Sequence, residues 1–571
     1  MGFCRNIRVE TGRIGSAHVK IPNFLPTSGG TTRNLASPHA ALWNSFFLFG
    51  IAFGFFQRHT IAEAEVNVAD FATVAADIDL RLQEAVDRMP TPSDDATFFS
   101  RVWLDLAGRR PDATDIKQFL GNSNPEKRNA LVKQLLSNSR FGRHWGRYWR
   151  DTILARRADE RALQLVSDSL TDAVAQRINN NVRWDQIATD FITASGDVRK
   201  HGVTGLFLAQ KGEPEGITAE VARIFLGIQI QCAQCHDHPT DQWKREQFHQ
   251  LAAFFPRVGV RRTRDGKPRS FEVYSRNKQG RGKKSKNKKP LEYYMPDLAQ
   301  PDSRGQITKP IFFLTGHSLE LGTTDKTRRE ALAHWLTDAE TNPWFARAYV
   351  NRVWTELMGH GFYASVDDIG PERDCAHPAI LSLLAEHFVA RDYDTKWLFQ
   401  TIMATAAYQS STPLPGETTE ANPSRPLRSD VIFDNLVQAL EVTRSAKGQS
   451  NQKQRGKAMQ VFQQAFFYDP SLPRDEINPT IPQALLLMNS RQIYQFIRSD
   501  RPNTMLGRLL VEQSDNEDVV ETLYLRCLGR FPTDQEWRTC LKHLQEEKNR
   551  NVACEDILWS LLNTAEFRQR N

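Results

Sequence analysis

Apolar side chains recur every three to four residues along most of this chain, and this spacing constrains its fold more than any other sequence feature. Phe141, Trp145, Trp149 and Ile153 show it most clearly, with one large side chain per helical turn. Such a period places the apolar residues on one face of an α-helix. The same spacing recurs in residues 218–228, 342–357 and 377–388. Runs typical of strands are few and short, at residues 205–208, 271–274 and 311–314. The sequence therefore predicts a mainly α fold, a multi-helix two-domain architecture with few short strands.

Stretches rich in Lys, Arg, Gly and Asn separate the helical segments and set the expected boundaries. The longest, residues 257–309, has little apolar periodicity and is predicted to be a basic flexible loop or linker. Further loops are predicted at residues 411–426 and 447–457. The expected parts are a signal peptide or membrane anchor (1–64), a first helical domain (66–256), the linker (257–309), a second helical domain (310–499) and a C-terminal helical module (504–571).

The C-terminal module repeats an N-terminal one. Residues 103–111 (WLDLAGRRP) align with residues 524–532 (YLRCLGRFP). Each copy indicates a helix that a glycine ends in the left-handed conformation and a proline that starts the next helix. We expect the two copies to be packing modules that lie against one another.

The formal net charge of +7 is unevenly distributed. Residues 1–64 carry +4 and residues 257–289 carry +12, which leaves −9 for the rest of the chain. A nucleic-acid-binding protein carries basic charge on its folded face, so specific nucleic-acid binding is not expected. The lysine-rich residues 283–289 could bind an anionic polymer, but a solvated loop explains them as well.

The first 64 residues have the pattern of an export signal. Basic residues precede an apolar run at residues 42–56, and Ala62-Glu63-Ala64 is an A-x-A cleavage pattern. The apolar run is shorter than the roughly twenty residues that a membrane span needs. We therefore expect an extracytoplasmic protein, periplasmic or secreted, from which the signal is cleaved or on which residues 42–56 remain as a membrane anchor.

The strongest chemical motif is C-x-x-C-H, formed by Cys232, Cys235 and His236. This spacing is typical of covalent haem c attachment, in which the two thiols form thioethers and the adjacent imidazole ligates iron. Disulfides also form in oxidising compartments, so a structural disulfide between the two cysteines of C-x-x-C is an alternative interpretation. A third interpretation is a zinc or other transition-metal site. Its ligands would be Cys232, Cys235, His236 or His238, and His249.

The sequence leaves the sixth haem ligand and the other cysteines open. The sixth iron position would be vacant or filled by His238, His249, Met295, Met358 or Met488. Cys375, Cys527, Cys540 and Cys554 lie outside the motif, and a disulfide among the last three is an open alternative.

A second polar group, Asn351, Arg352, Asp367 and Asp368, lies among apolar residues. Paired carboxylates could serve acid–base chemistry. Adjacent acids in an extended segment point in different directions, so we favour an Arg–Asp pair that fastens a helix to the next loop.

Several motifs together resemble one family of proteins. The motif lies within residues 225–239 (FLGIQIQCAQCHDHP), followed by DQW at 241–243 and FHQLAAFF at 248–255. These runs, with residues 101–108 and 180–186, resemble the planctomycete cytochrome-like domain, domain of unknown function fifteen-forty-nine. Residues 342–354 (NPWFARAYVNRVW), 359–361, 365–368, 408–411 and 480–489 resemble its usual companion, domain fifteen-fifty-three.

The resemblance implies a cytochrome-like protein whose activity is not established. With the motif and the export pattern, it leads us to expect an exported haem-c-binding protein of redox or electron-transfer character. Its partners would be redox proteins of the cell envelope. The alternative is a cell-envelope binding or scaffold protein in which C-x-x-C-H holds a structural metal.

Overall fold

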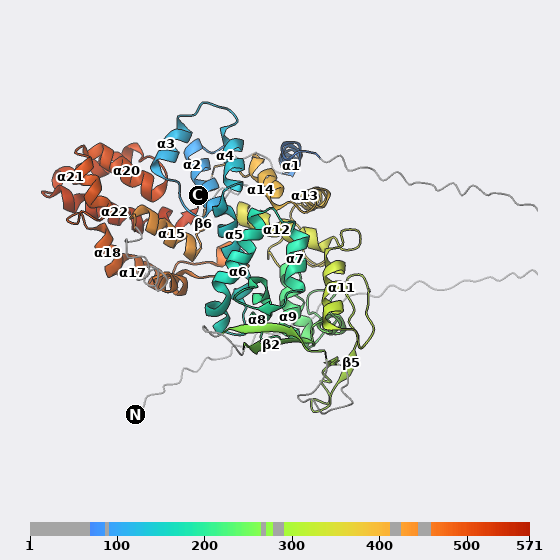
Figure 1. Cartoon of the computed structure of the whole chain (residues 1–571). Helices are drawn as coiled ribbons and strands as arrows, with labels where there is room; N and C mark the ends of the chain where they lie inside the picture. The colour runs from blue at the N-terminus through green and yellow to red at the C-terminus, as the bar shows by residue number, and fades with distance from the viewer. Residues whose placement is uncertain are drawn as a thin grey trace, which may run out of the picture. The chain divides into compact units, whose positions relative to one another are not determined.

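Helices dominate the computed structural model, as the apolar spacing predicts (Figure 1). The structure describes residues 69–85, 91–263, 270–277, 291–411, 424–442 and 458–570. The first helices are α1 (Phe71–Ala85), α2 (Asp95–Val102), α3 (Ala113–Leu120), α4 (Lys127–Leu136), α5 (Ser139–Ala155), α6 (Arg161–Asn179), α7 (Trp184–Ile192), α8 (Gly205–Ala209), α9 (Pro214–Val221) and α10 (Arg245–Ala252). The later ones are α11 (Asp325–Thr337), α12 (Trp344–Met358), α13 (Pro378–Ala390), α14 (Thr395–Ala404), α15 (Ser429–Ala439), α17 (Ile481–Asn489), α18 (Arg491–Ile497), α19 (Met505–Glu512), α20 (Asn516–Leu528), α21 (Asp534–Glu546) and α22 (Arg550–Asn563).

Shorter helical turns connect these elements. Two are π-helical, η1 (Trp103–Ala107) and η3 (Ala222–Leu226). The others are 3₁₀ turns, η2 (Gly202–Thr204), η4 (Ile230–Gln234), η5 (Arg474–Glu476) and η6 (Glu566–Arg568). Both π-helical turns prolong an α-helix and end at a glycine with positive φ. Such turns are rare and occur often at functional sites.

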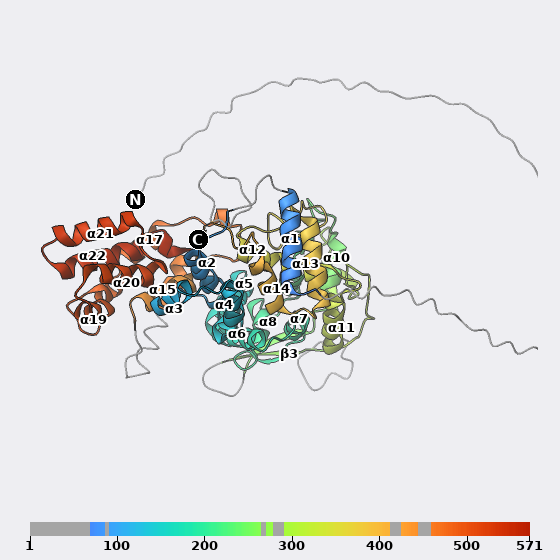
Figure 2. The same cartoon turned by 90° about the horizontal axis from the view of Figure 1, so that it is seen from above.

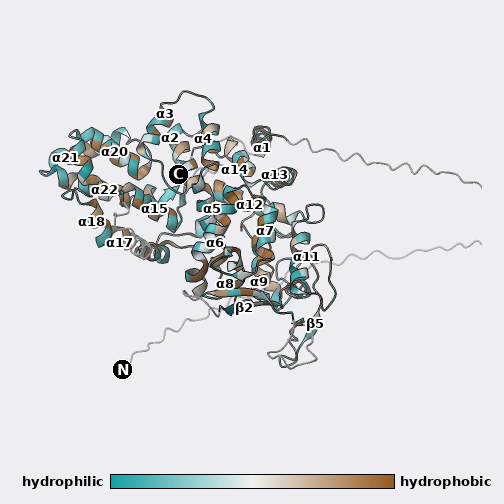
Figure 3. Cartoon of the chain, in the orientation of Figure 1, coloured by the Kyte–Doolittle hydropathy of each residue, from teal (hydrophilic) through white to brown (hydrophobic). Residues whose placement is uncertain are grey.

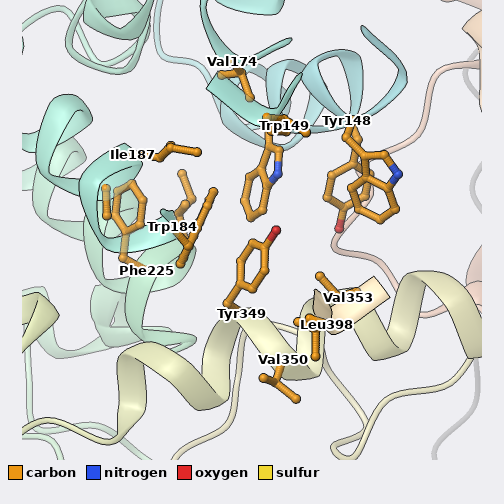
Figure 4. Packing of buried hydrophobic residues seen from close by; sticks show 14 of the residues in the cluster. Tyr148, Trp149, Val174, Trp184, Ile187, Phe225, Tyr349, Val350, Val353 and Leu398 are labelled. Atoms are coloured by element: carbon orange, nitrogen blue, oxygen red, sulfur yellow. The ribbon is translucent and has the colours of Figure 1, made fainter. Parts of the chain in front are cut away.

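A buried aromatic group joins segments from both expected domains (Figure 4). Trp149 of α5 lies 4.6 Å from Trp184 of α7, and Tyr349 of α12 lies 4.2 Å from Trp184, between ring centroids. Large aromatic side chains contribute much of the apolar area that a core removes from water. The two expected domains therefore share one hydrophobic core, and their boundaries stay a prediction.

The other helices pack around this core by their apolar faces. α5 lies along α6, and α1 lies against α13 and α14, as Figure 2 shows. Figure 3 shows hydrophobic residues gathered along α6, α7 and α8, whereas α21 is mostly hydrophilic. Burial of such faces drives helix packing. None of the helices in the described ranges is long and apolar enough to span a membrane.

The strands are short and antiparallel. β1 (Gly196–Asp197), β3 (Phe271–Ser275) and β2 (Val258–Arg262) form one sheet in that order. β4 (Tyr293–Met295) pairs with β5 (Gln306–Thr308), and β6 (Arg425–Pro426) with β7 (Gln569–Arg570).

The described parts of residues 257–309 correct the expectation of a flexible linker. They form β2 to β5, and the Arg257 guanidinium is buried against the Glu292 carboxylate at 2.6 Å. Cross-strand pairing and this buried ion pair order a segment whose composition reads as a loop. Residues 264–269 and 278–290, with the lysine run, lie outside the described residues.

Two other expected strands are wrong. Residues 205–208 lie in α8, where every side chain is buried, and periodicity does not distinguish a fully buried helix from a buried strand. Residues 311–314 contribute an isolated bridge from Ile311 to Ser318 and otherwise form a turn. The expected strand at residues 271–274 is confirmed as β3.

The two repeat copies contact each other, as expected. Arg110, in the turn of the first copy, donates to the carbonyl of Leu528 in the second at 2.6 Å and to that of Glu566 at 2.7 Å. Leu104 of the first copy belongs to the hydrophobic cluster that the C-terminal helices form. The repeat therefore marks two modules that share an interface.

Candidate functional site

The C-x-x-C-H segment leaves the core after a helix that ends at Gly227. α9 continues as η3, and Gly227 closes it with a φ of 65°, a conformation that glycine adopts without steric cost. The helix therefore ends five residues before Cys232 rather than running into the motif. Inside α9, the Thr218 hydroxyl donates to the Pro214 carbonyl.

Cys232 lies in the 3₁₀ turn η4, and Cys235 directly follows it as its C-cap. Side chains three residues apart lie on the same face of such a turn. Ile230 and Ala233 are buried, whereas Cys232 and Cys235 are exposed and carry free thiols. The apolar pair therefore anchors the turn in the core, and the cysteine pair faces outward.

His236 follows this turn and is exposed as well. Its Nδ1 lies 2.7 Å from the carbonyl oxygen of Asp237. Because a carbonyl can only accept, Nδ1 carries the ring proton, and the lone pair of the neutral ring is on Nε2. An imidazole held in this way is ready to ligate a metal through Nε2.

These three side chains fit the requirements of haem c. Thioether formation needs two accessible thiols at this spacing, and iron needs one available imidazole nitrogen.

Two surface hollows, of about 290 and 430 Å³, lie away from the C-x-x-C-H segment. The first is beside the start of α13, and the second is on α20 and α21.

The alternative metal site is not assembled among the described residues, where no three His, Cys, Asp or Glu side chains converge closely enough to hold a metal ion. Both ring nitrogens of His249 have other partners, the Tyr293 hydroxyl at 2.9 Å and the Gln234 carbonyl at 3.0 Å. The Nδ1 atom of His238 accepts from the Thr240 amide at 3.3 Å. Haem c needs no such convergence, because its thiols bond to the porphyrin rather than to iron.

The other sixth-ligand candidates are scattered through the fold. Met358 is 1% exposed inside α12, Met295 lies on β4, and Met488 is 48% exposed on α17. The remaining cysteines of the described ranges are free thiols, so the structure holds none of the alternative disulfides. Burial raises the pKa of the Cys527 thiol to about 12.

The loop between α12 and α13 holds the segment that leads into the motif. The Ile369 amide donates to the Gly227 carbonyl at 2.8 Å, and the Gln229 amide group donates to Asp367 at 3.0 Å. These bonds fix the chain just before Cys232.

The same loop also holds the segment that follows the motif. The Arg373 guanidinium donates to the Thr240 carbonyl at 2.7 Å and pairs with Asp368 at 2.9 Å. The C-x-x-C-H segment is therefore fastened on both sides to one loop of the second expected domain.

Asp367 and Asp368 have separate partners, in agreement with a structural role. Asp367 is fully buried beside the guanidinium groups of Arg223 at 2.9 Å and Arg352 at 3.6 Å, which lower the pKa of its carboxyl to about 2 despite its burial. Asn351 donates to the Val366 carbonyl and thus fastens α12 to this loop.

Sequence reasoning missed the partners that hold the motif in place. Tyr293 and Glu215 carried no signal in the sequence, because Tyr293 reaches His249, and Glu215 reaches Tyr293, only through tertiary contacts over long sequence separations. No local sequence pattern indicated the role of Arg373 either. His249 belongs to the run at 248–255. The sequence indicated it only as a possible metal ligand and not as a residue that supports the motif.

Comparison with known proteins gives two family matches. Residues 74–259 match the family described as PSCyt2, protein of unknown function (DUF1549). Residues 328–439 match the family described as PSD1, protein of unknown function (DUF1553). Neither a curated protein nor a solved structure matches the chain.

Proposed function

This chain belongs to the proteins that pair a PSCyt2 domain with a PSD1 domain, and we propose that it is an exported protein that binds one covalent haem c and serves in redox or electron transfer. Cys232 and Cys235 hold the porphyrin, and His236 ligates the iron through Nε2. When bound, the haem supplies one-electron redox chemistry.

One observation carries the proposal. Cys232 and Cys235 are both exposed free thiols, and the Nδ1–H of the adjacent His236 already donates to a carbonyl. Ile230 and Ala233 keep the turn seated in the core while the thiols stay accessible. The protein's part is to hold the three ligating groups in a fixed order on one surface turn. The basic and apolar pattern of residues 1–64 supports export, although it lies outside the described residues.

The test is expression with an export pathway and haem-c maturation machinery, followed by absorbance spectroscopy of the purified protein. We expect a Soret band that survives denaturation and that Cys235→Ala abolishes. Cys375→Ala is the matched control, because this half-buried cysteine lies outside the motif and should leave the band intact. A mature protein with stoichiometric zinc and no Soret band would refute the proposal.

A cell-envelope binding or scaffold role is the second candidate, and the exposed apolar face of α17 favours it. Ile481 is 75% exposed, Leu485 51% and Met488 48%, and they lie three to four residues apart on one helix face. Exposed apolar faces of this kind often mark interaction sites. If the motif then holds a structural metal, a chelator should lower the melting temperature by several degrees, and no change would count against that role.

A further inference from the structure

We infer that Glu215, Tyr293 and His249 form a positioning chain, a series of hydrogen bonds that holds the C-x-x-C-H turn from the inside through the carbonyl of Gln234. In this account His249 acts on the turn through its hydrogen bond and is not an iron ligand. The relevance of this positioning chain to haem binding rests on the proposed function. Its hold on the turn does not depend on haem.

The contact with the turn is made by His249. Its Nε2 lies 3.0 Å from the carbonyl oxygen of Gln234, the residue just before Cys235. Because this carbonyl accepts only, Nε2 carries a proton and donates it. His249 is 1% exposed, so solvent cannot readily replace the bond. Its loss would leave a buried donor unsatisfied.

The other ring nitrogen of His249 makes a second hydrogen bond. The Nδ1 atom of His249 lies 2.9 Å from the Tyr293 hydroxyl, which lies 2.8 Å from Oε1 of Glu215. The three residues come from α10, β4 and α9, so the chain joins three elements behind the turn.

The hydroxyl of Tyr293 links the other two members of the positioning chain. Nε2 is already protonated, and the tyrosine has one hydroxyl proton to donate. The Tyr293 hydroxyl donates to Oε1 of Glu215 and also lies within hydrogen-bond distance of Nδ1 of His249.

The surroundings favour the neutral imidazole. Burial lowers the pKa of His249, and the nearby positive charge of Arg245 lowers it further. Glu215 is the acidic group facing this site from α9, and Tyr293 faces it from β4.

The experiment measures hydrogen exchange by mass spectrometry on the full chain prepared without haem. The reporter is the peptide that spans residues 228–244. His249→Asn retains an amide near the position of Nδ1 but loses the reach to Gln234, whereas His249→Gln keeps a donor near the position of Nε2. We expect about fivefold faster exchange in His249→Asn, the factor that the loss of one hydrogen bond of typical strength produces. His249→Gln should restore the slow exchange.

Tyr293→Phe provides a milder test, because it removes one hydroxyl and retains the ring. It should also speed exchange in the reporter peptide. Tyr294→Phe is the matched control on the same strand, where the ring packs against Arg304 instead, and should change nothing. Equal exchange in all four variants and the wild type would overturn the inference, as would equal acceleration by His249→Asn and His249→Gln.

Nitrogen NMR of His249 adds a readout that general destabilisation does not imitate. We expect a protonated Nε2 in the wild type and in Tyr293→Phe. An unprotonated Nε2 would overturn the inference. Since these measurements use haem-free protein, a failure to find haem would leave them standing.

Discussion

Asp367 illustrates how single residues in this protein keep buried charges ionised. It has no exposed surface, and desolvation alone would raise the pKa of its carboxyl. The positive charges of Arg223, Arg352 and Arg156 outweigh that effect and lower the pKa to about 2. The arginine partners keep the Asp367 carboxylate ionised. Removal of this carboxylate therefore leaves buried guanidinium groups without a compensating negative charge.

Asp367→Asn should therefore lower the free energy of unfolding by about 3 kcal/mol, the usual cost of breaking a buried ion pair from one side. Asp368→Asn is the control, because Asp368 is partly exposed and pairs with Arg373. It should cost less than about 1 kcal/mol. Urea unfolding measures both, and equal losses would contradict the special role of Asp367.

His144 makes stability depend on pH. Burial and the nearby Arg428 lower the pKa of its imidazole to about 3, against an ordinary value of 6.5. Between these values the unfolded chain binds a proton that the folded protein does not, so stability is lost as pH falls from about 6.5 toward 3.

Between pH 7 and pH 5, His144 should account for a loss of about 2 kcal/mol in unfolding free energy. His144→Gln, which stays neutral, should flatten the pH dependence by that amount in urea titrations at both pH values. His334→Gln, at an exposed position on α11, should leave the slope unchanged. A slope that His144→Gln does not alter would contradict the assignment.

At the scale of elements, the end of η3 sets where the motif begins. Gly227 has a positive φ, and a Cβ there would lie 2.9 Å from Cδ1 of Ile369 and 3.3 Å from Cβ of Ala348. Two constraints therefore act at this position, the left-handed backbone and the close contact with the loop that holds the motif.

Gly227→Ala should show the sum of these two constraints. The backbone conformation alone costs about 1 kcal/mol, and the crowding adds roughly another 1–3 kcal/mol. Gly316→Ala isolates the first part, because Gly316 has a φ of 77° and no atom within 4 Å of an added Cβ. Thermal unfolding of the two variants gives the difference, and equal melting temperatures would contradict the crowding.

The sequence predicted elements well where one face is buried. The four-residue spacing from Phe141 to Ile153 is confirmed as α5, and the spacing over residues 342–357 is confirmed as α12. Prediction failed in α8, since all its side chains are buried and no periodicity remains. It also failed for β2, β4 and β5, whose order comes from cross-strand pairing and the buried pair of Arg257 and Glu292.

At the scale of the whole molecule, Arg110 joins the two repeat modules across a long sequence separation. Arg110 is 3% exposed, and its guanidinium donates to the carbonyls of Leu528 and Glu566. Arg110→Leu would leave these buried carbonyls without their charged donor and should cost about 3 kcal/mol. Arg109→Leu should cost less, because Arg109 forms an ion pair with the exposed Asp112. Calorimetry tests this, and a larger loss for Arg109→Leu would contradict the account.

The candidate site was predictable in its ligands but not in its support. Cys232, Cys235 and His236 follow from local spacing alone. The bonds from Arg373 and from the chain of His249, Tyr293 and Glu215 depend on which distant segments the fold brings together, and no local pattern encodes them.

The central claim is that the C-x-x-C-H segment carries haem, and a pyridine haemochrome spectrum of the exported, matured protein tests it most directly. The account predicts the spectrum of a thioether-linked haem at about one per chain, absent when both Cys232 and Cys235 are replaced by alanine. Correctly exported protein with intact thiols, folded and free of haem, would contradict it.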